Sequence, residues 1–198
     1  MSNGEKYINR KFIICLTGMP GAGKSTVAEL IRDQGFVLIN MGDCIRTEAK
    51  KNNLELNDKN LGNLMLNLRN KFGPGAVAHL VINQINEKFS NDSFDKFIID
   101  GIRSIQEIKL LRTVGIVKIL AIHGSLSTRF RNLKNRSRPD APSNLEDCLI
   151  RDQRELSVGV SEVIALADEI ISNNEISIEE LKKKSMLITK KWISSLSS

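Results

Sequence analysis

The chain alternates short apolar runs with longer stretches in which apolar positions recur every three or four residues. The short runs predict buried strands at residues 11–17, 35–40, 95–100, 115–122 and 169–172. Helical spacing predicts helices at residues 26–32, 44–53, 59–71, 76–89, 104–113, 144–156, 160–167 and 178–193. Strands that alternate with helices are typical of an α/β fold. We therefore expect three layers, with a five-stranded parallel sheet flanked by helices.

Length and composition indicate one domain. The 198 residues suit a single buried core, and we find no linker, repeat or low-complexity segment that would divide residues 1–198. No apolar run approaches the roughly 20 residues of a membrane helix. The first residues also lack an apolar signal region, so we expect a cytoplasmic protein without membrane contact.

Residues 18–26, GMPGAGKST, match the pattern Gly-x-x-x-x-Gly-Lys-Ser/Thr between a predicted strand and a predicted helix. Glycines let successive backbone N–H groups turn toward a phosphate chain, and the helix N-terminus adds partial positive charge. Lys24 would reach the β- and γ-phosphates, and the Ser25 hydroxyl would hold Mg²⁺. The sequence thus predicts that ATP and Mg²⁺ bind here. The predicted nucleotide contacts are Gly18, Gly21, Ala22, Gly23, Lys24, Ser25, Thr26 and, later in the chain, Arg129.

Asp100 ends the third predicted strand. Ligands of parallel α/β sheets gather at the carboxyl ends of the strands. Beside a phosphate loop, an aspartate there is suited to hold Mg²⁺ opposite Ser25. The alternative is an aspartate that only caps the next loop.

Two arginines follow neighbouring strands of the predicted sheet. Gly42 and Asp43 precede Arg46 after the second strand, and Arg103 comes three residues after Asp100. Each alone is also compatible with a surface position. Together, two guanidinium groups bind a phosphate in bidentate fashion, which indicates an acceptor that itself carries phosphate.

A basic stretch follows the fourth strand. Arg129, Arg136 and Arg138 surround a segment bounded by proline, and such arginines in a kinase lid neutralise the charge of the moving phosphoryl group. Arg151 and Arg154 lie three residues apart on the next predicted helix and suit the same purpose. We predict that both bind the acceptor, as do Gly42 and Asp43. The alternative is a helix with internal ion pairs, since Asp147, Arg151 and Glu155 are spaced at i,i+4.

These segments resemble the nucleoside monophosphate kinases, adenylate kinases in particular. That family has a phosphate loop, a Gly-Asp-x-x-Arg segment, an Asp-Gly-x-Pro-Arg segment and an arginine-bearing lid, although the proline is absent here. The resemblance implies a P-loop NTPase fold with a small helical acceptor-binding region at about 42–90 and a short lid at about 127–155. It implies that Arg46 and Arg103 bind the acceptor phosphate.

A second resemblance covers nearly the whole chain. It rests on the phosphate loop and on DGIRS, RSR, RDQREL and AD at residues 100–104, 136–138, 151–156 and 167–168. These segments resemble an archaeal family related to adenylate kinase and dephospho-coenzyme A kinase. Residues 167–173 also resemble a segment of dephospho-coenzyme A kinases that lies near the adenine of ATP.

The function expected from these features is an ATP-dependent phosphotransfer to a small nucleotide-like acceptor, with a nucleoside monophosphate such as AMP as the leading candidate. Lys24, Arg103, Arg136 and Arg138 would be catalytic. A dephospho-coenzyme A acceptor is an alternative, with Asp43 as the base for a ribose hydroxyl.

A P-loop ATPase that serves as an RNA-linked assembly factor is another alternative. The net charge of +6 supports nucleic-acid binding, although a solvated lysine face near the C-terminus also explains it. Cys15, Cys44 and Cys148 have no paired spacing, so neither a disulfide framework nor a zinc site is expected.

Overall fold

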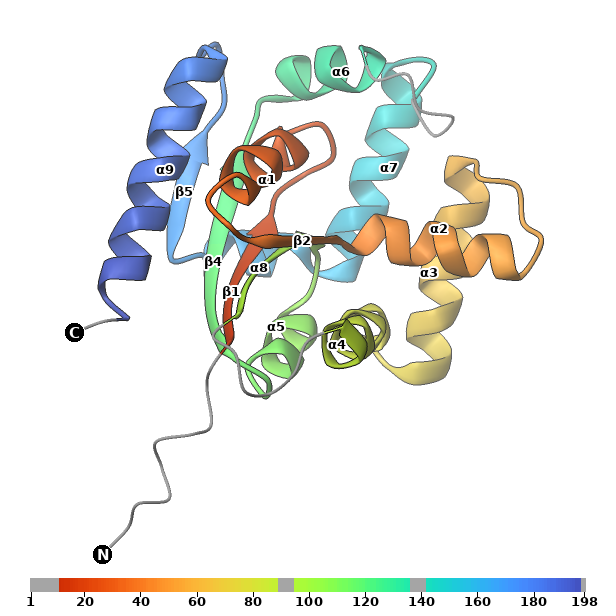
Figure 1. Ribbon diagram of the computed structural model, residues 1–198. Helices are drawn as coiled ribbons and strands as arrows, with labels where there is room; N and C mark the ends of the chain where they lie inside the picture. Colours follow the sequence, from red (N-terminus) through yellow and green to blue (C-terminus); the bar gives the residue numbers. More distant parts are fainter. Residues whose placement is uncertain (1–10, 89–94, 136–141, 197–198) are drawn as a thin grey trace, which may run out of the picture.

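The computed structural model describes residues 11–88, 95–135 and 142–196 (Figure 1). Its centre is one sheet of five parallel strands in the order β2-β3-β1-β4-β5. This confirms the predicted five-stranded parallel sheet. The strands are β1 (Lys11–Thr17), β2 (Val37–Asn40), β3 (Asp95–Ile102), β4 (Ile116–His123) and β5 (Glu169–Ser172).

Nine helices are assigned in the described part of the chain. Polar side chains cap many of them, and Ser104 and Glu107 form a capping box at the start of α5. The helices are α1 (Lys24–Arg32), α2 (Met41–Lys51), α3 (Asp58–Phe72), α4 (Ala76–Lys88), α5 (Ile105–Leu111), α6 (Leu126–Lys134), α7 (Leu145–Val158), α8 (Val160–Ala165) and α9 (Ile178–Ser194).

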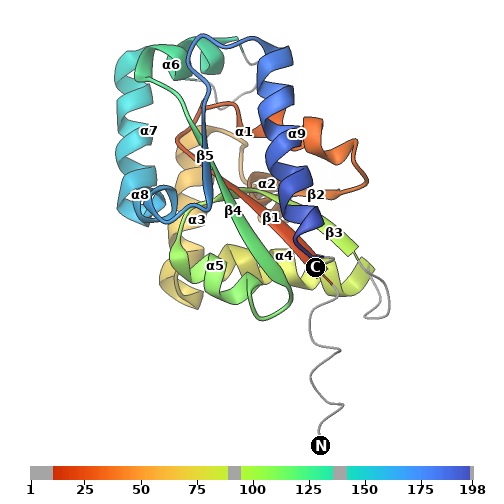
Figure 2. The ribbon, with the colours of Figure 1, turned by 90° about the vertical axis from the view of Figure 1, so that its left-hand side faces the viewer.

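The two faces of the sheet are buried under different helices (Figure 2). On β1, side chains at even positions such as Phe12 and Ile14 pack with α1 and α9. Its odd positions, Ile13 and Cys15, belong to the core that includes α4, α5 and α8. Every residue of β1 is buried, as expected for a central parallel strand. The sheet thereby holds the loop that follows β1 on a rigid base.

The third strand ends later than its sequence predicts. β3 continues past Asp100 to Ile102, and its register with β1 shifts at Gly101, which has a φ of 104°. The Thr17 hydroxyl donates to the carbonyl oxygen of Ile102 at 2.9 Å across this irregularity. A bulge re-aims the neighbouring side chain, and here it lets Asp100 face the phosphate loop while the strand continues.

The basic stretch after β4 contains a helix that the sequence analysis did not predict. α6 begins after Ser125, whose side chain accepts a hydrogen bond from the Thr128 backbone N–H. Apolar residues then recur at helical spacing, at Leu126, Phe130 and Leu133. The sequence therefore contained both an N-cap and the apolar periodicity of a helix. The density of arginines in this segment had suggested only a lid.

Candidate functional site

The residues between β1 and α1 form a phosphate loop at the carboxyl edge of the sheet. Gly18, Gly21 and Gly23 have φ values of 137°, 80° and 102°, which side-chain-bearing residues rarely adopt. Lys24 folds back across the loop, and its Nζ donates to the carbonyl oxygens of Gly18 at 2.8 Å and Met19 at 3.1 Å. These carbonyl contacts hold the ammonium over the loop, where a phosphate chain would lie.

Ser25 and Asp100 meet beside this loop. The Ser25 hydroxyl donates to Oδ2 of Asp100 at 3.0 Å, and the Asn40 side chain donates to the same oxygen at 2.8 Å. The other oxygen, Oδ1 of Asp100, is buried and has no hydrogen-bond partner within the described residues. A hydroxyl beside an unpartnered carboxylate oxygen suits Mg²⁺, so this pair of side chains fits the predicted metal position.

Asn40 is a site residue that the sequence analysis missed. Besides its bond to Asp100, its Oδ1 accepts the Asp43 backbone N–H at 3.1 Å and caps α2. One side chain therefore joins the Asp100 carboxylate to the helix that carries Arg46. The signal was an asparagine at the end of a strand and before a helix, which is a common N-cap pattern.

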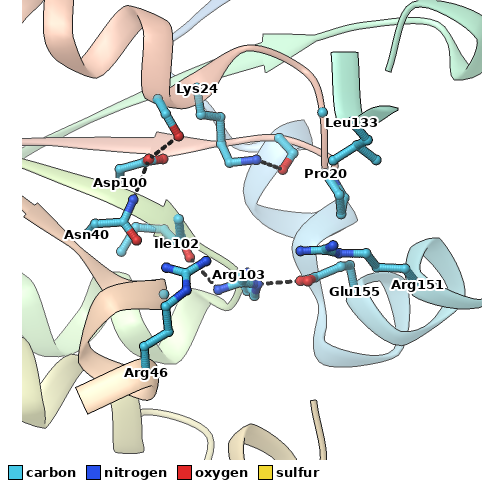
Figure 3. A pocket seen from close by; sticks show the side chains of 15 residues that line it. Pro20, Lys24, Asn40, Arg46, Asp100, Ile102, Arg103, Leu133, Arg151 and Glu155 are labelled. Carbon is cyan, nitrogen blue, oxygen red and sulfur yellow. Dashed lines mark hydrogen bonds and ion pairs between the residues drawn. The ribbon is translucent and has the colours of Figure 1, made fainter. Parts of the chain in front are cut away.

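The loop opens into a pocket where three predicted arginines converge (Figure 3). Arg46 comes from α2, Arg103 follows β3, and Arg151 comes from α7, so residues distant in sequence meet beside Lys24. The residues that line this pocket are Gly18, Pro20, Gly21, Lys24, Ser25, Asn40, Gly42, Arg46, Asp100, Gly101, Ile102, Arg103, Leu133, Arg151 and Glu155.

A second pocket continues from the first between α2, α3 and α7. Both pockets share Gly42, Arg46, Arg103, Arg151 and Glu155, so these residues surround the junction between the two spaces. Beyond the junction, the second pocket has an apolar wall and two further charged groups. These residues are Ile45, Leu61, Gly62 and Met65, together with Asp58 and Arg154.

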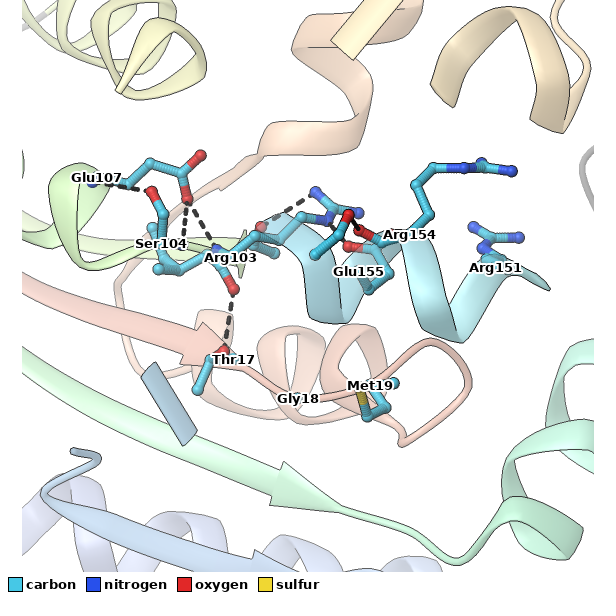
Figure 4. Close-up of polar contacts among 12 residues, drawn as sticks. Thr17, Gly18, Met19, Arg103, Ser104, Glu107, Arg151, Arg154 and Glu155 are labelled. Carbon is cyan, nitrogen blue, oxygen red and sulfur yellow. Dashed lines mark hydrogen bonds and ion pairs between the residues drawn. The ribbon is translucent and has the colours of Figure 1, made fainter. Parts of the chain in front are cut away.

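Arg103 is held by two carboxylates (Figure 4). Its Nε donates to Oε2 of Glu155 on α7, and its backbone N–H donates to Glu107 of α5 at 2.8 Å. Burial by itself would lower the pKa of Arg103, but the charge and hydrogen bond of Glu155, together with the charges of Glu107 and Asp100, outweigh burial and raise that pKa. Burial opposes ionisation of Glu155 too, yet the Arg103 guanidinium keeps the Glu155 pKa below its ordinary value. Both groups are therefore charged at neutral pH.

Arg46 carries its own counter-ion. Its Nη1 lies 2.6 Å from Oδ1 of Asp43, one helical turn earlier on α2, and the Asp43 side chain is 69% exposed. The Asp43 carboxylate thus neutralises Arg46 at the pocket rim. Such a paired and exposed carboxylate is poorly placed to act as a base within the pocket.

Arg151 and Arg154 both reach α3. Arg154 Nη2 lies 2.9 Å from Oδ2 of Asp58, and Arg151 Nη1 lies 3.5 Å from its Oδ1. Arg154 also lies across Gly62, where an added Cβ would come within 2.4 Å of its Nη1. These contacts favour the acceptor-side position that was predicted for both arginines over ion pairs within one helix.

Arg129 lies behind the phosphate loop. Its guanidinium pairs with both carboxylate oxygens of Asp152 at 2.7 and 2.6 Å, and it also donates to the carbonyl oxygens of Gly124 and Pro20 at 3.1 and 3.2 Å. Arg129 is 6% exposed. This geometry favours support of the loop over the direct nucleotide contact that we expected. The other two lid arginines, Arg136 and Arg138, lie outside the described residues.

A third pocket lies on the other side of the loop, between α6 and the segment after β5. Asn173 and Asn132 donate to the carbonyl oxygens of Ala22 and Gly21, each at 2.9 Å. Thr26, a predicted nucleotide contact, lines this pocket. The asparagines link the loop to the segment that resembles an adenine-binding strand, and the sequence analysis did not single them out.

Metal clusters, reactive thiols and membrane-spanning helices are absent from the described residues. They include no group of three or more His, Cys, Asp or Glu residues placed to hold a metal, and all three cysteines are buried and free. Burial raises the pKa of Cys15 and of Cys148, so these thiols stay protonated. Within the same ranges, no helix has the length and apolar character needed to cross a membrane.

Solved structures share this fold at low sequence identity. A Thermus thermophilus protein, TT1252, aligns with a TM-score of 0.62 and 20% identity, covering 91% of this chain and 97% of that protein. Shikimate kinase from Bacteroides thetaiotaomicron aligns with a TM-score of 0.57 and 16% identity, covering 90% and 98%. These similarities show that the chain shares its fold with TT1252 and with shikimate kinase.

Sequence comparisons identify the family. The model of an AAA domain matches residues 17–148. A UPF0200 protein of Methanococcus maripaludis is 40% identical over 161 residues, which cover 81% of this chain and 87% of the relative. One from Staphylothermus marinus is 39% identical over 182 residues, covering 92% and 93%. The chain therefore belongs to the UPF0200 family of proteins with a kinase-like P-loop fold.

Proposed function

We propose that this protein transfers the γ-phosphoryl group of ATP to a small acceptor that already carries a phosphate, and that the acceptor is a nucleoside monophosphate such as AMP. The observation that carries the proposal is the shared pocket. The phosphate loop and the Ser25–Asp100 pair open into the same space as Arg46, Arg103 and Arg151. A donor phosphate and an anionic acceptor would meet there.

The carboxylates of the two pockets support an anionic acceptor. Asp100 accepts from Ser25 and Asn40, Glu155 from Arg103, and Asp58 pairs with α7. Asp100 is assigned to Mg²⁺ and the other two carboxylates are held in ion pairs, whereas a hydroxyl acceptor needs a base that can take its proton. An acceptor phosphate is ionised at neutral pH and attacks without that help.

The side chains divide the work of in-line transfer. Backbone N–H groups of the loop and Lys24 would hold the β- and γ-phosphates, and Ser25 with Asp100 would hold Mg²⁺, which neutralises developing charge when bound. Arg46 and Arg103 would bind the acceptor phosphate and align it with the γ-phosphate. Arg151, at the junction of the pockets, would stabilise charge on the transferring group. Arg136 and Arg138 remain predicted lid contacts.

The third pocket supports a place for the nucleoside of ATP. It adjoins Gly23 and Thr26 at the start of α1 and includes the amide side chains of Asn132, Asn135 and Asn173. Amides both donate and accept hydrogen bonds, which suits the edge of a nucleobase. In this arrangement, donor base and acceptor lie on opposite sides of the phosphate loop.

The decisive experiment is an acceptor panel. The protein is incubated with ATP, Mg²⁺ and each of several nucleoside monophosphates, dephospho-coenzyme A and shikimate, and products are separated by ion-exchange chromatography. We expect nucleoside diphosphate from at least one monophosphate. Transfer only to dephospho-coenzyme A would select the kinase alternative with Asp43 as base. ATP hydrolysis that rises only with RNA would select the assembly-factor alternative.

A cytoplasmic location remains a prediction from the sequence.

A further inference from the structure

Asp58 lies between two arginines of α7, in a position suited to an anion. It is the first residue of α3, and its two carboxylate oxygens face two different arginines of α7, at 2.9 Å from Arg154 and 3.5 Å from Arg151. Arg154 also donates through Nη1 to the Asp58 carbonyl oxygen at 3.3 Å. Two guanidinium groups that converge on two oxygens reproduce the geometry with which proteins bind phosphate.

The two arginine side chains are less exposed to solvent than their partner, Asp58. The arginine side chains are 17% and 21% exposed, whereas the Asp58 side chain is 35% exposed. The guanidinium groups are thus the more buried part of the contact, and Gly62 leaves room for Arg154 to lie close to α3. The carboxylate sits on the more open side, where solvent or a ligand can replace it.

We infer that Asp58 is an internal stand-in for the anionic group of the acceptor. Without acceptor, it partly neutralises Arg151 and Arg154 and links α3 to α7. When the acceptor enters, its phosphate binds Arg154 together with Arg46 and Arg103. Arg151 then becomes free to face the transferring group, and Asp58 turns to solvent. This inference rests on the proposed function, because it assumes that the second pocket receives the acceptor. No bond forms or breaks in the exchange, which is a competition between two anions for one site.

The competition between Asp58 and the acceptor also affects the donor side of the site, because Arg151 lies between the two pockets. Arg151 lines both pockets, and Arg154 lines only the second. A carboxylate that holds Arg151 toward α3 keeps its charge from the donor phosphates until an acceptor arrives. Asp58 would therefore lower the affinity of the pocket for anions and also restrain Arg151 in the absence of acceptor.

Phosphate titrations of four proteins test the inference. Inorganic phosphate is titrated by calorimetry into the wild type, Asp58→Asn, Arg154→Gln and the double variant. Asparagine keeps the size of the side chain and removes the competing charge. A partly exposed ion pair contributes up to about 1 kcal/mol, so we expect Asp58→Asn to bind phosphate up to about fivefold more tightly. In the Arg154→Gln background the gain should fall below about twofold, because the competed group is gone.

A matched control separates this effect from general loss of negative charge. Glu48 on α2 pairs with Lys51 at 3.4 Å and lines neither the first nor the second pocket. Glu48→Gln should bind phosphate as the wild type does. Thermal unfolding of every variant checks that the fold is retained, and the loss of one such pair should lower Tm by about 2–4 °C at most.

Three outcomes would overturn the inference. They are phosphate binding to Asp58→Asn that is unchanged or weaker, an equal gain in Glu48→Gln, and a full gain that persists in the Arg154→Gln background. The last outcome would place the phosphate on the phosphate loop instead. Because these titrations require no transfer reaction, a negative acceptor panel would refute the proposed function while leaving this result intact.

Discussion

The buried contact between Glu155 and Arg103 makes a strong prediction. Glu155→Gln removes the negative charge but keeps nearly the same shape, and Arg103 then retains a hydrogen-bond partner without a counter-ion. The side chains are 7% and 21% exposed, so solvent replaces little of the lost interaction. Breaking a fully buried pair costs about 3–5 kcal/mol. With one hydrogen bond kept and Arg103 partly exposed, we expect a loss of about 2 kcal/mol in the free energy of unfolding.

The contribution of Glu155 to stability should depend on pH in a defined direction. The pKa of Glu155 is lower in the folded protein than its ordinary value of 4.5, because Arg103 favours the carboxylate. Its contribution to stability is therefore fully present above the pKa of glutamate in the unfolded chain, and it is lost as pH falls through the folded pKa. The difference between wild type and Glu155→Gln should thus be largest near neutral pH and should narrow as pH falls below the pKa of glutamate in the unfolded chain, about 4.3.

Urea denaturation followed by circular dichroism measures this difference. The wild type, Glu155→Gln and the exposed control Glu146→Gln, also on α7, are compared at neutral pH and at several acidic values. The control should change stability by less than about 1 kcal/mol. If the Glu155→Gln difference stayed constant down to pH 3, or if both variants lost the same stability, the ion pair would not be the cause. In the transfer assay, a less restrained Arg103 should lower kcat by about tenfold, the effect of about 1.4 kcal/mol on the barrier.

Three further predictions concern the loop and its supports. Lys24→Ala should abolish ATP binding in calorimetry and leave thermal unfolding nearly unchanged, because Nζ donates to carbonyl oxygens within its own loop; heat of binding equal to that of the wild type would contradict the role of Lys24. Asp100→Asn should raise the Mg²⁺ concentration needed for nucleotide binding by about tenfold or more, and Asn40→Ala should raise it less, since Asn40 orients the carboxylate without replacing it. Arg129→Ala should cost about 3 kcal/mol in urea denaturation by stranding Asp152, and a double variant with Arg129→Met and Asp152→Leu should lose less. A double variant that is no more stable than Arg129→Ala would refute that argument.

The charged segment of α7 shows where sequence reasoning reached its limit. Arg151, Asp152, Arg154 and Glu155 have spacings that also suit ion pairs along one helix. In the structure they pair with Asp58, Arg129 and Arg103, on three other elements. Spacing reveals which face of a helix a side chain shares, but it carries no information on which distant element packs there.

The inward face of α7 is polar, which is the reverse of a usual surface helix. Cys148, Asp152 and Glu155 are buried, whereas Leu145 and Leu156 are each 46% exposed. Hydrophobic periodicity predicts the helix, but it also predicts that the leucine-bearing face packs on the core, which is the wrong face. Only the positions of Arg103 and Arg129 in the folded chain explain why charged groups face inward.

Local signals therefore determined the elements and the chemistry of the phosphate loop. The apolar runs, the glycine spacing and Lys24 act within a few residues, where backbone geometry follows directly from sequence. Tertiary structure alone decided that Asn40 braces Asp100, that Arg129 supports the loop from behind, and that Asp58 pairs with two arginines of α7. These contacts join residues far apart in the chain, and their partners depend on the order of strands in the sheet and on how helices pack at its carboxyl edge.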